Sequence, residues 1–276
     1  HPGEAEERAA DFLGDPPGQP FFLAVGFGET HRDYPEESPE DNPDFCMPPL
    51  PLPDTPETRK DIARYKACAR ILDRKMGRVL EALKESGLED NTLVICTTDH
   101  GIAFPFMKCN LLDGGIGVML MLKGGPFTGV GALDALVSHV DLFPTVCDLL
   151  EIPAPERLEG VSLLPLVRKE NSDVREAVFA EVNYHAAYEP MRAIRTKRYK
   201  YIRRYDGRSA PVLPNCDDGE TKTLLLERGW STRAPEEEAL YDLTFDPGET
   251  RNLAGHPEAS AELERMRDLL RDWMEK

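Results

Sequence analysis

Two apolar runs on either side of a long amphipathic segment constrain the fold of this chain more than any other feature. Residues 21–27 and 91–98 each predict a strand buried on both faces, as in a parallel sheet. Residues 57–86 carry apolar side chains at spacings of three and four, which predicts one long helix. Thr58 is its candidate cap and Gly87 its end. Strand, helix and strand in this order predict a βαβ unit and a doubly wound, mostly parallel α/β sheet.

Further elements are predicted in the first 175 residues. Residues 4–13 predict a short helix, and residues 116–122 predict a third strand. Another helix is predicted to begin at Asp141, whose side chain can cap it. Residues 35–56 are rich in prolines and acids and predict a long irregular loop, of the kind that often carries function.

The pattern changes after about residue 175. Short strands separated by polar turns are predicted at 177–181 and 191–204, and a last helix at 257–274. This part predicts a smaller antiparallel sheet closed by a C-terminal helix. We therefore divide the chain into residues 1–175, which belong to the α/β sheet, and residues 176–276, a small α+β subdomain.

Charge and cysteine content exclude several classes of protein. The net charge of −17 argues against nucleic-acid binding, and the basic run at 192–204 is predicted to be the solvated face of a strand. No run of 18 apolar residues exists, so we expect no membrane partner. The six cysteines include no CxxC pair, which argues against a zinc knuckle, and we expect buried free thiols.

Polar residues that suit metal or anion binding follow two of the predicted strands. One strand ends in Glu29-Thr30-His31-Arg32, and another ends in Thr98-Asp99-His100-Gly101. In open α/β sheets, ligands bind beyond the carboxyl ends of the strands. An oxygen-rich site favours Ca²⁺ or Mg²⁺, and an imidazole shifts the preference towards Mn²⁺ or Zn²⁺. The alternative is a plain strand-to-loop turn in which Asp99 is a capping residue.

The segment at 91–101 resembles the sulfatase stretch in which a buried strand delivers metal ligands just before a glycine. Other segments resemble landmarks of that family in the same order along the chain: residues 20–31, Lys108 with Gly114-Gly115, and residues 138–145, 159–166, 195–201 and 240–249. The chain therefore resembles the C-terminal portion of a sulfatase of the alkaline-phosphatase-like superfamily. The context at 104–105 and 110–111 favours the heparan N-sulfatase-like (N-sulfoglucosamine sulfohydrolase) members.

The resemblance implies two metal ligands. These are Asp99 and His100, with Ca²⁺ as the expected ion and Mg²⁺ or Mn²⁺ as alternatives. Many members of the family carry Asn where this chain carries His100, which leaves the second ligand and the identity of the metal open.

The resemblance also implies catalytic and substrate-binding residues. Lys108 is expected to contact the sulfate and the oxygen of the nucleophile, where its charge offsets the developing negative charge. His31 is expected to contact the sulfate or to protonate the leaving group. Without the resemblance, Lys108 reads as a solvated loop lysine and His31 as a capping or surface residue. Arg32 is a further candidate for substrate contact, with a surface role as its alternative, and His185 is a candidate for lining a substrate cleft.

The sequence departs from the family in one respect. Sulfatases use a formylglycine nucleophile made from a Cys/Ser-x-Pro/Ala-x-Arg motif, and no cysteine of this chain stands in that context. We expect the formylglycine and two further metal-binding carboxylates in a missing N-terminal segment, which is then a partner of this chain, and we expect the chain alone to be inactive.

Three hypotheses follow for the activity. The first is a metal-dependent hydrolase of sulfuric esters or sulfamates that acts on a sulfated small molecule or carbohydrate. The second is a phosphodiesterase or phosphonate monoester hydrolase of the same superfamily. The third is a non-catalytic α/β binding module.

Overall fold

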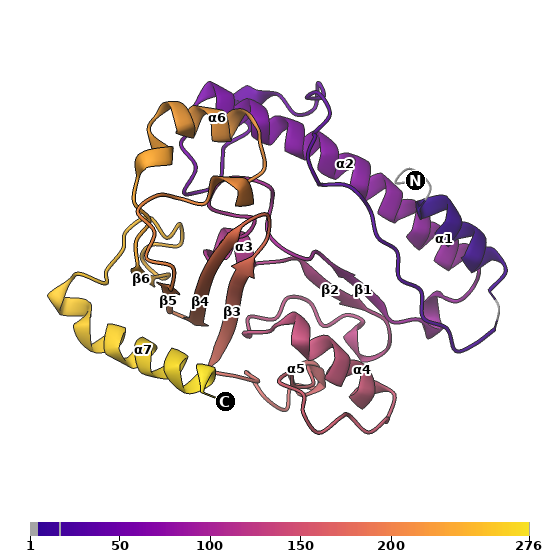
Figure 1. The fold of residues 1–276 in the computed structure, drawn as a ribbon. Coiled ribbons are helices and arrows are strands. Elements are labelled where there is room, and N and C mark those ends of the chain that lie inside the picture. The colour runs from indigo at the N-terminus through magenta and orange to yellow at the C-terminus, as the bar shows by residue number, and fades with distance from the viewer. Residues whose placement is uncertain (1–4, 17, 276) are drawn as a thin grey trace.

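The computed structural model describes residues 5–16 and 18–275 (Figure 1). Its α-helices are α1 (Ala5–Gly14), α2 (Pro56–Glu85), α3 (Asp113–Ile116), α4 (Leu142–Leu149), α5 (Leu164–Val167), α6 (Glu220–Glu227) and α7 (Ser260–Met274). Its β-strands are β1 (Val94–Thr97), β2 (Leu120–Lys123), β3 (Ala177–Tyr184), β4 (Tyr188–Thr196), β5 (Tyr199–Arg204) and β6 (Glu238–Asp242). The predicted helices at 57–86 and 257–274 are confirmed as α2 and α7, and that at 4–13 as α1, with residue 4 outside the described residues.

The long helix α2 begins and ends at clear local signals. Its N-cap is Thr55, whose hydroxyl accepts a hydrogen bond from the Thr58 backbone N–H. The prediction of Thr58 as the cap was therefore wrong, because Thr58 already lies inside the first turn. Gly87 follows the helix with a φ of +71°, as a glycine after a helix C-terminus commonly does. The C-terminal part of α2 packs against α1 (Figure 1).

The predicted strand at 21–27 is not a strand in the structure. Exposure alternates along these residues, and Phe22 is 91% exposed. Phe21 and Leu23 pack against the α1 and α2 pair, while the backbone forms no ladder with any described strand. An apolar run becomes a strand only when a neighbour pairs with its N–H and C=O groups, and sequence periodicity does not supply that neighbour. The predicted βαβ unit is therefore wrong in its first strand.

The strands β1 and β2 form a two-stranded antiparallel sheet, with Val94 opposite Lys123 and Thr97 opposite Leu120. The parallel arrangement predicted for this part is thus not seen between these two strands. The third strand was predicted at 116–122 but begins at Leu120, because Asp113–Ile116 is the helix α3. The helix predicted at Asp141 is confirmed as α4. The predicted side-chain cap is wrong, because the buried Asp141 carboxylate accepts the backbone N–H groups of Ser138 and Val161 instead of one in α4.

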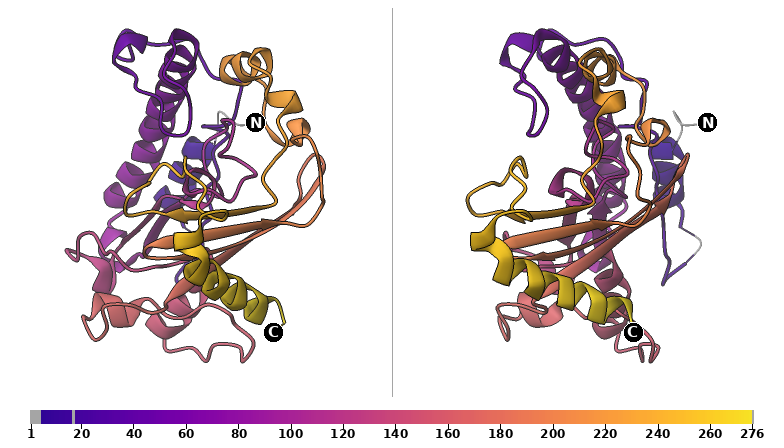
Figure 2. Two further views of the ribbon diagram at one scale, coloured as in Figure 1. Left: turned by 90° about the vertical axis from the view of Figure 1, so that its left-hand side faces the viewer. Right: turned by 60° about the vertical axis from the view of Figure 1, so that its left-hand side comes forward.

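The predicted small antiparallel sheet with its C-terminal helix is confirmed. The sheet has the order β3-β4-β5-β6 with every pair antiparallel. Helix α7 crosses one face of it (Figure 2), where Ile194, Tyr201 and Leu240 pack against helix residues. On the opposite face of the sheet, Met191 and Ile202 pack with Leu111, Leu112 and Ile116. The period-two alternation of the strands therefore places the small sheet directly against the segment that follows Lys108.

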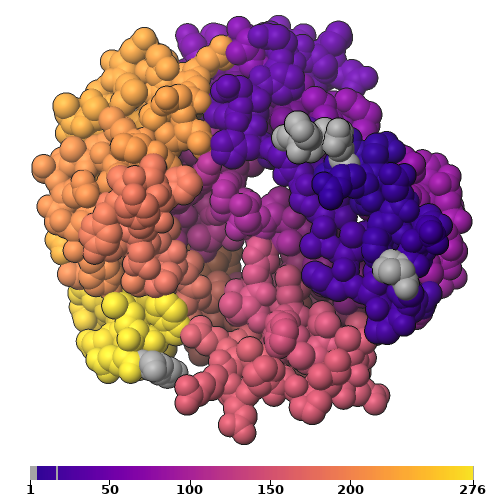
Figure 3. All heavy atoms as spheres, turned by 45° about the vertical axis from the view of Figure 1, so that its right-hand side comes forward, coloured from indigo at the N-terminus to yellow at the C-terminus, as the bar shows by residue number. Residues whose placement is uncertain are grey.

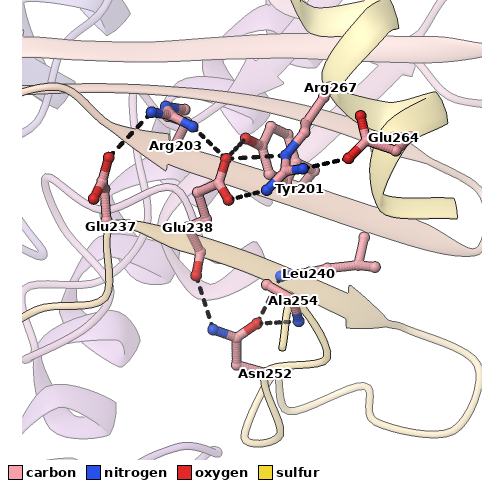
Figure 4. Close-up of polar contacts among 9 residues, drawn as sticks. All are labelled: Tyr201, Arg203, Glu237, Glu238, Leu240, Asn252, Ala254, Glu264 and Arg267. Atoms are coloured by element: carbon pink, nitrogen blue, oxygen red, sulfur yellow. Dashed lines mark hydrogen bonds and ion pairs between the residues drawn. The ribbon is translucent and has the colours of Figure 1, made fainter. Parts of the chain in front are cut away.

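A charged network joins β5, β6 and α7 (Figure 4). The Glu238 carboxylate accepts hydrogen bonds from the Tyr201 hydroxyl at 2.6 Å and from the guanidinium groups of Arg203 and Arg267. Nearby, the Asn252 side chain donates to the Glu238 carbonyl oxygen and accepts the N–H of Leu240, both within 2.9 Å. Burial opposes ionisation, but the hydrogen bonds from Arg267 and Tyr201 and the nearby positive charges lower the pKa of Glu238 to about 2.

The basic run at 192–204 is only partly solvated, and Lys200 contradicts the prediction. Its side chain is fully buried, and its ammonium contacts Asp113 and lies 2.8 Å from Oε1 of Glu249. All six cysteines are free, as predicted, but Cys96 and Cys109 are only partly buried. Among the helices of the described residues, none combines the length and the apolar character that crossing a membrane requires.

Candidate functional site

Lys108 lies on a tightly turned loop between β1 and α3. Its backbone N–H donates to the carbonyl oxygen of Ile102 at 3.1 Å, which folds the loop back beside the end of β1. Phe106 and Cys109 on either side have φ angles of +67° and +58°. Left-handed backbone at a bulky residue costs free energy, and such residues gather at functional sites. The Lys108 side chain is buried, so the prediction of a solvated loop lysine is wrong.

His31 contacts Lys108 in the structure, while the roles that the resemblance implied for both residues stay predictions. The Lys108 ammonium lies 3.3 Å from the Nε2 of His31, and the His31 Nδ1 lies 2.6 Å from the carbonyl oxygen of Arg32. An ammonium can only donate, so Nε2 is the acceptor and Nδ1 carries the proton in this arrangement. An ammonium and an imidazole thus lie side by side, and together they suit an oxyanion and its leaving group.

Asp217 completes this group, and the sequence analysis missed it. Its Oδ2 lies 2.9 Å from the Lys108 ammonium. Burial works against ionisation of Asp217, but the hydrogen bond from Lys108 and the positive charge around it hold the pKa of this carboxyl below its usual range. The residue precedes α6 and carries no local pattern that distinguishes it from other acidic loop residues, so the sequence offered no signal for it.

Arg32 is buried and fully engaged by the protein. Two of its guanidinium nitrogens donate to the two carboxylate oxygens of Asp61, both at 2.8 Å, and Nε donates to the Ala103 carbonyl oxygen at 2.9 Å. The guanidinium also lies 4.4 Å from the ring centre of Tyr34. Asp61 in turn accepts both the N–H and the hydroxyl of Thr221. The predicted surface alternative for Arg32 is wrong, and its contact with substrate stays a prediction.

Asp99 and His100 follow the end of β1. The Asp99 side chain is mostly exposed, and the His100 side chain is partly exposed. The His100 Nδ1 lies 2.7 Å from the Gly101 carbonyl oxygen, which assigns the ring proton to Nδ1. Nε2 then presents a lone pair to the Asp99 Oδ2, 3.5 Å away. Two lone-pair donors facing each other favour a cation, and metal-bound histidines commonly donate their other N–H to a carbonyl.

The metal set is incomplete in the part of the chain that the structure describes. That part contains no group of three or more His, Cys, Asp or Glu side chains placed to hold a metal ion. Asp99 and His100 fit two positions of a cation site, and their role as ligands stays a prediction.

Close backbone packing holds this turn. A Cβ on Gly101 would lie 1.8 Å from the carbonyl oxygen of Gly114, and one on Gly115 would lie 2.2 Å from that of Asn110. The Gly101 N–H donates to the Gly115 carbonyl oxygen at 2.8 Å. The glycine pair therefore lets the segment after Lys108 pack directly on the turn that carries Asp99.

His185 was the remaining candidate for contact with substrate. It is exposed on the turn between β3 and β4, and its backbone N–H donates to the Ala187 carbonyl oxygen at 3.3 Å. Among the described residues, its imidazole forms no hydrogen bond or ion pair with His31, Lys108 or Asp99. Its predicted place in a substrate cleft stays untested.

Figure 3 shows an opening in the centre of one face, bordered by the N-terminal residues in indigo and by residues from the middle of the chain in magenta.

Comparisons with known proteins converge on one family. A profile described as Sulfatase matches residues 6–152, and a profile described as N-sulphoglucosamine sulphohydrolase, C-terminal, matches residues 112–215. N-sulphoglucosamine sulphohydrolase of Homo sapiens is 29% identical over 314 residues, which cover 95% of this chain and 62% of the relative. The chain thus spans less than two thirds of the length of that relative.

Solved structures agree on the fold. A Bacteroides fragilis protein provisionally described as a sulfatase matches with a TM-score of 0.74 and 21% identity, over 99% of this chain and 58% of that one. The phosphonate monoester hydrolase of Agrobacterium radiobacter matches with a TM-score of 0.59 and 24% identity, over 78% of this chain and 41% of that one. At these identities the matches speak to the fold alone, and they confirm the predicted α/β class.

Proposed function

This chain belongs to the sulfatase family, as the match over residues 6–152 shows, and from that premise we propose that it forms part of a metal-dependent hydrolase of sulfuric esters or sulfamates. The observation that carries the proposal is the contact between the buried Lys108 and His31, 3.3 Å apart. A buried ammonium is costly unless an anion pairs with it, and Asp217 supplies one partner from outside the loop. The substrate sulfate is proposed as the second.

In this proposal each residue has a separate task. Lys108 donates hydrogen bonds to a sulfate oxygen and offsets the negative charge that grows during transfer. His31 holds or delivers the proton of the leaving oxygen or nitrogen, a task that suits an imidazole near neutral pH. Asp217 pairs with the ammonium of Lys108 and keeps it directed towards His31. Arg32 fixes the position of His31 through its two bonds to Asp61.

The metal and the nucleophile belong to the finer part of the proposal. We propose that Asp99 and His100 hold a divalent cation, with Ca²⁺ first because oxygen donors favour it. The ion would polarise the sulfate, and formylglycine would supply the nucleophilic oxygen. The 276 residues contain no Cys/Ser-x-Pro/Ala-x-Arg motif, so we propose that the nucleophile comes from a part of the protein outside them.

A sulfated saccharide is the proposed substrate class. The human relative takes its name from N-sulphoglucosamine, an amino sugar that carries a sulfamate. Nothing in the arrangement of Lys108 and His31 distinguishes a sulfate from a phosphonate by itself, since both present anionic oxygens. The family profile favours the sulfatase over the phosphonate hydrolase, with which the chain shares its fold.

The experiment compares this chain with the full protein that contains it, produced with its formylglycine installed. We expect the chain alone to be inactive and the full protein to hydrolyse glucosamine N-sulfate in the presence of Ca²⁺. Lys108→Ala in the full protein should lower kcat/KM by roughly a hundredfold or more, as removal of one charge-stabilising donor does. The control is Lys123→Ala, an exposed lysine paired with Glu89, which should leave the activity unchanged.

Two outcomes would contradict the proposal. Unchanged turnover in Lys108→Ala would remove Lys108 from the reaction. Faster hydrolysis of a phosphonate monoester than of any sulfate ester or sulfamate would favour the phosphonate hydrolase instead.

A further inference from the structure

A cluster of charges joins the small sheet to the segment that follows Lys108. Its central cation is Lys200 of β5, whose side chain is fully buried. The ammonium contacts the carboxylate of Asp113, the first residue of α3, and lies 2.8 Å from Oε1 of Glu249. Two guanidinium nitrogens of Arg195 on β4 donate to the two carboxylate oxygens of Asp113, both at 3.1 Å. Two cations thus face two carboxylates at this junction.

The cluster holds Asp113 by its backbone as well as by its side chain. Oε2 of Glu249 accepts the backbone N–H of Asp113. Glu249 itself has a left-handed φ of +53°, and its side chain is 3% exposed. Left-handed backbone at such a residue costs free energy and is retained where the surroundings determine its position. The start of α3 is therefore held from β4, from β5 and from the segment after β6.

The glycine pair that directly follows Asp113 contacts the turn at residues 99–101. The Gly115 carbonyl oxygen accepts the Gly101 N–H at 2.8 Å. A Cβ on Gly101 would lie 1.8 Å from the carbonyl oxygen of Gly114, so the two backbones touch. The residue that the charge cluster holds is therefore joined to the turn by one hydrogen bond and by direct backbone packing.

The same glycine pair borders the loop of Lys108. A Cβ on Gly114 would lie 3.0 Å from the Met107 side chain, and one on Gly115 would lie 2.4 Å from the Met107 carbonyl oxygen. Closely packed groups transmit a displacement to their neighbours. A shift at the start of α3 would therefore move both the turn at residues 99–101 and the loop of Lys108.

We propose that Lys200 is a positioning residue for the proposed cation site, which acts through Asp113 and Glu249 to fix the turn at residues 99–101. Replacement of a buried ion pair by apolar groups of similar volume often leaves stability unchanged. The main effect of removing this cluster should therefore fall on the placement of the turn. The inference rests on the proposed function only for the cation, because the contact between cluster and turn needs no ion.

Hydrogen exchange tests the placement of the turn directly. It is measured by mass spectrometry on the metal-free full protein that contains this chain. In Lys200→Met the amides of residues 98–104 should exchange about tenfold faster or more, because the bond of the Gly101 N–H opens more often. The ladder between β3 and β4 should exchange as in the unaltered protein.

Two further variants separate placement from stability. Lys200→Met combined with Glu249→Gln removes both charges of one pair, so no carboxylate is left unpaired there, and it should show the same local increase at residues 98–104. This double variant serves if the single one folds poorly. The control is Glu238→Gln, which alters the charged network on the α7 face of the sheet and should leave the exchange of residues 98–104 unchanged.

Calorimetry with Ca²⁺ on the same full protein tests the consequence for the cation. Both Lys200 variants should weaken Ca²⁺ about ten- to a hundredfold, as loss of a group that orients metal ligands does. Glu238→Gln should leave the affinity for Ca²⁺ unchanged. Asp99→Asn tests the proposed ligand by itself and should weaken Ca²⁺ at least as much.

The outcomes distinguish this inference from the proposed function. Unchanged exchange at residues 98–104 in both Lys200 variants overturns the positioning role. Equally faster exchange across the whole protein, in Glu238→Gln as well, also overturns it, because the effect is then one of global stability. Faster exchange confined to residues 98–104, with an affinity for Ca²⁺ that Asp99→Asn does not change, supports the placement of the turn by Lys200 but contradicts the proposed cation site.

Discussion

Glu238→Gln should destabilise the protein in a manner that depends on pH. The carboxylate of Glu238 receives the Tyr201 hydroxyl and the guanidinium groups of Arg203 and Arg267, and its pKa is lowered from 4.5 to about 2 (Figure 4). A carboxyl whose folded pKa is depressed stabilises the fold above its unfolded pKa. That stability is lost as the pH falls from about 4.5 towards 2. Glutamine keeps the volume and can still accept the tyrosine hydroxyl, so the change removes chiefly the charge.

The magnitude follows from the pKa and from the exposure of the partners. A shift of about 2.5 units at 1.36 kcal/mol per unit gives about 3.4 kcal/mol as an upper bound. Arg203 and Arg267 are 37% and 33% exposed, so solvent screens part of this interaction and about half of it is expected to remain. We therefore predict a loss of about 1.5–2 kcal/mol at pH 7, which shrinks to about two fifths of that value at pH 3.

The assay is urea denaturation followed by circular dichroism between pH 3 and pH 7. The matched control is Glu264→Gln, which removes a 64% exposed carboxylate that contacts the same Arg267 and should cost less than about 0.5 kcal/mol. The reasoning is refuted if the difference between Glu238→Gln and the unaltered protein is the same at pH 3 as at pH 7. It is also refuted if the control costs as much as Glu238→Gln.

Two further substitutions test the contacts that support the site. Asp61→Asn breaks the buried pair with Arg32 and should cost about 3–5 kcal/mol in urea denaturation, because it leaves a buried charge unpaired; Asp54→Asn, in a pair that solvent reaches, should cost less than about 1 kcal/mol. Gly101→Ala places a Cβ 1.8 Å from a backbone carbonyl oxygen and should cost about 1–3 kcal/mol or more. Gly77→Ala, in open space within α2, should instead raise the melting temperature by stabilising the helix about 0.5–1 kcal/mol. A destabilised Gly77→Ala or an unaffected Gly101→Ala would contradict the packing described.

The elements that sequence periodicity predicted well are those whose stability is local. Helix α2 has its apolar stripe and its terminal glycine within its own residues, and α7 and the small sheet likewise follow their own patterns. The run at 21–27 has the composition of a buried strand but no ladder partner in the described structure. Strand pairing is a contact between distant segments, so composition alone does not decide it.

The candidate site, too, was predicted only in part from the sequence. Family motifs pointed to His31 and Lys108 independently, and the structure places them 3.3 Å apart. The residues that hold them were not predicted, because Asp217 and Asp61 have no periodic or motif signal of their own. Their role is visible only once the chain has folded and a buried cation needs a counter-charge.

Two ion pairs and one pair of hydrogen bonds join residues on the two sides of residue 175. Lys108 is paired by Asp217, Asp61 by the N–H and hydroxyl of Thr221, and Asp113 by Lys200. In each case a group before residue 175 has its partner after it, and a buried charge without its partner costs several kcal/mol. The part after residue 175 therefore supplies the carboxylate that pairs with the lysine on which the proposed chemistry rests. A boundary drawn from composition divides the pattern of the sequence, whereas the site itself is built from both sides of that boundary.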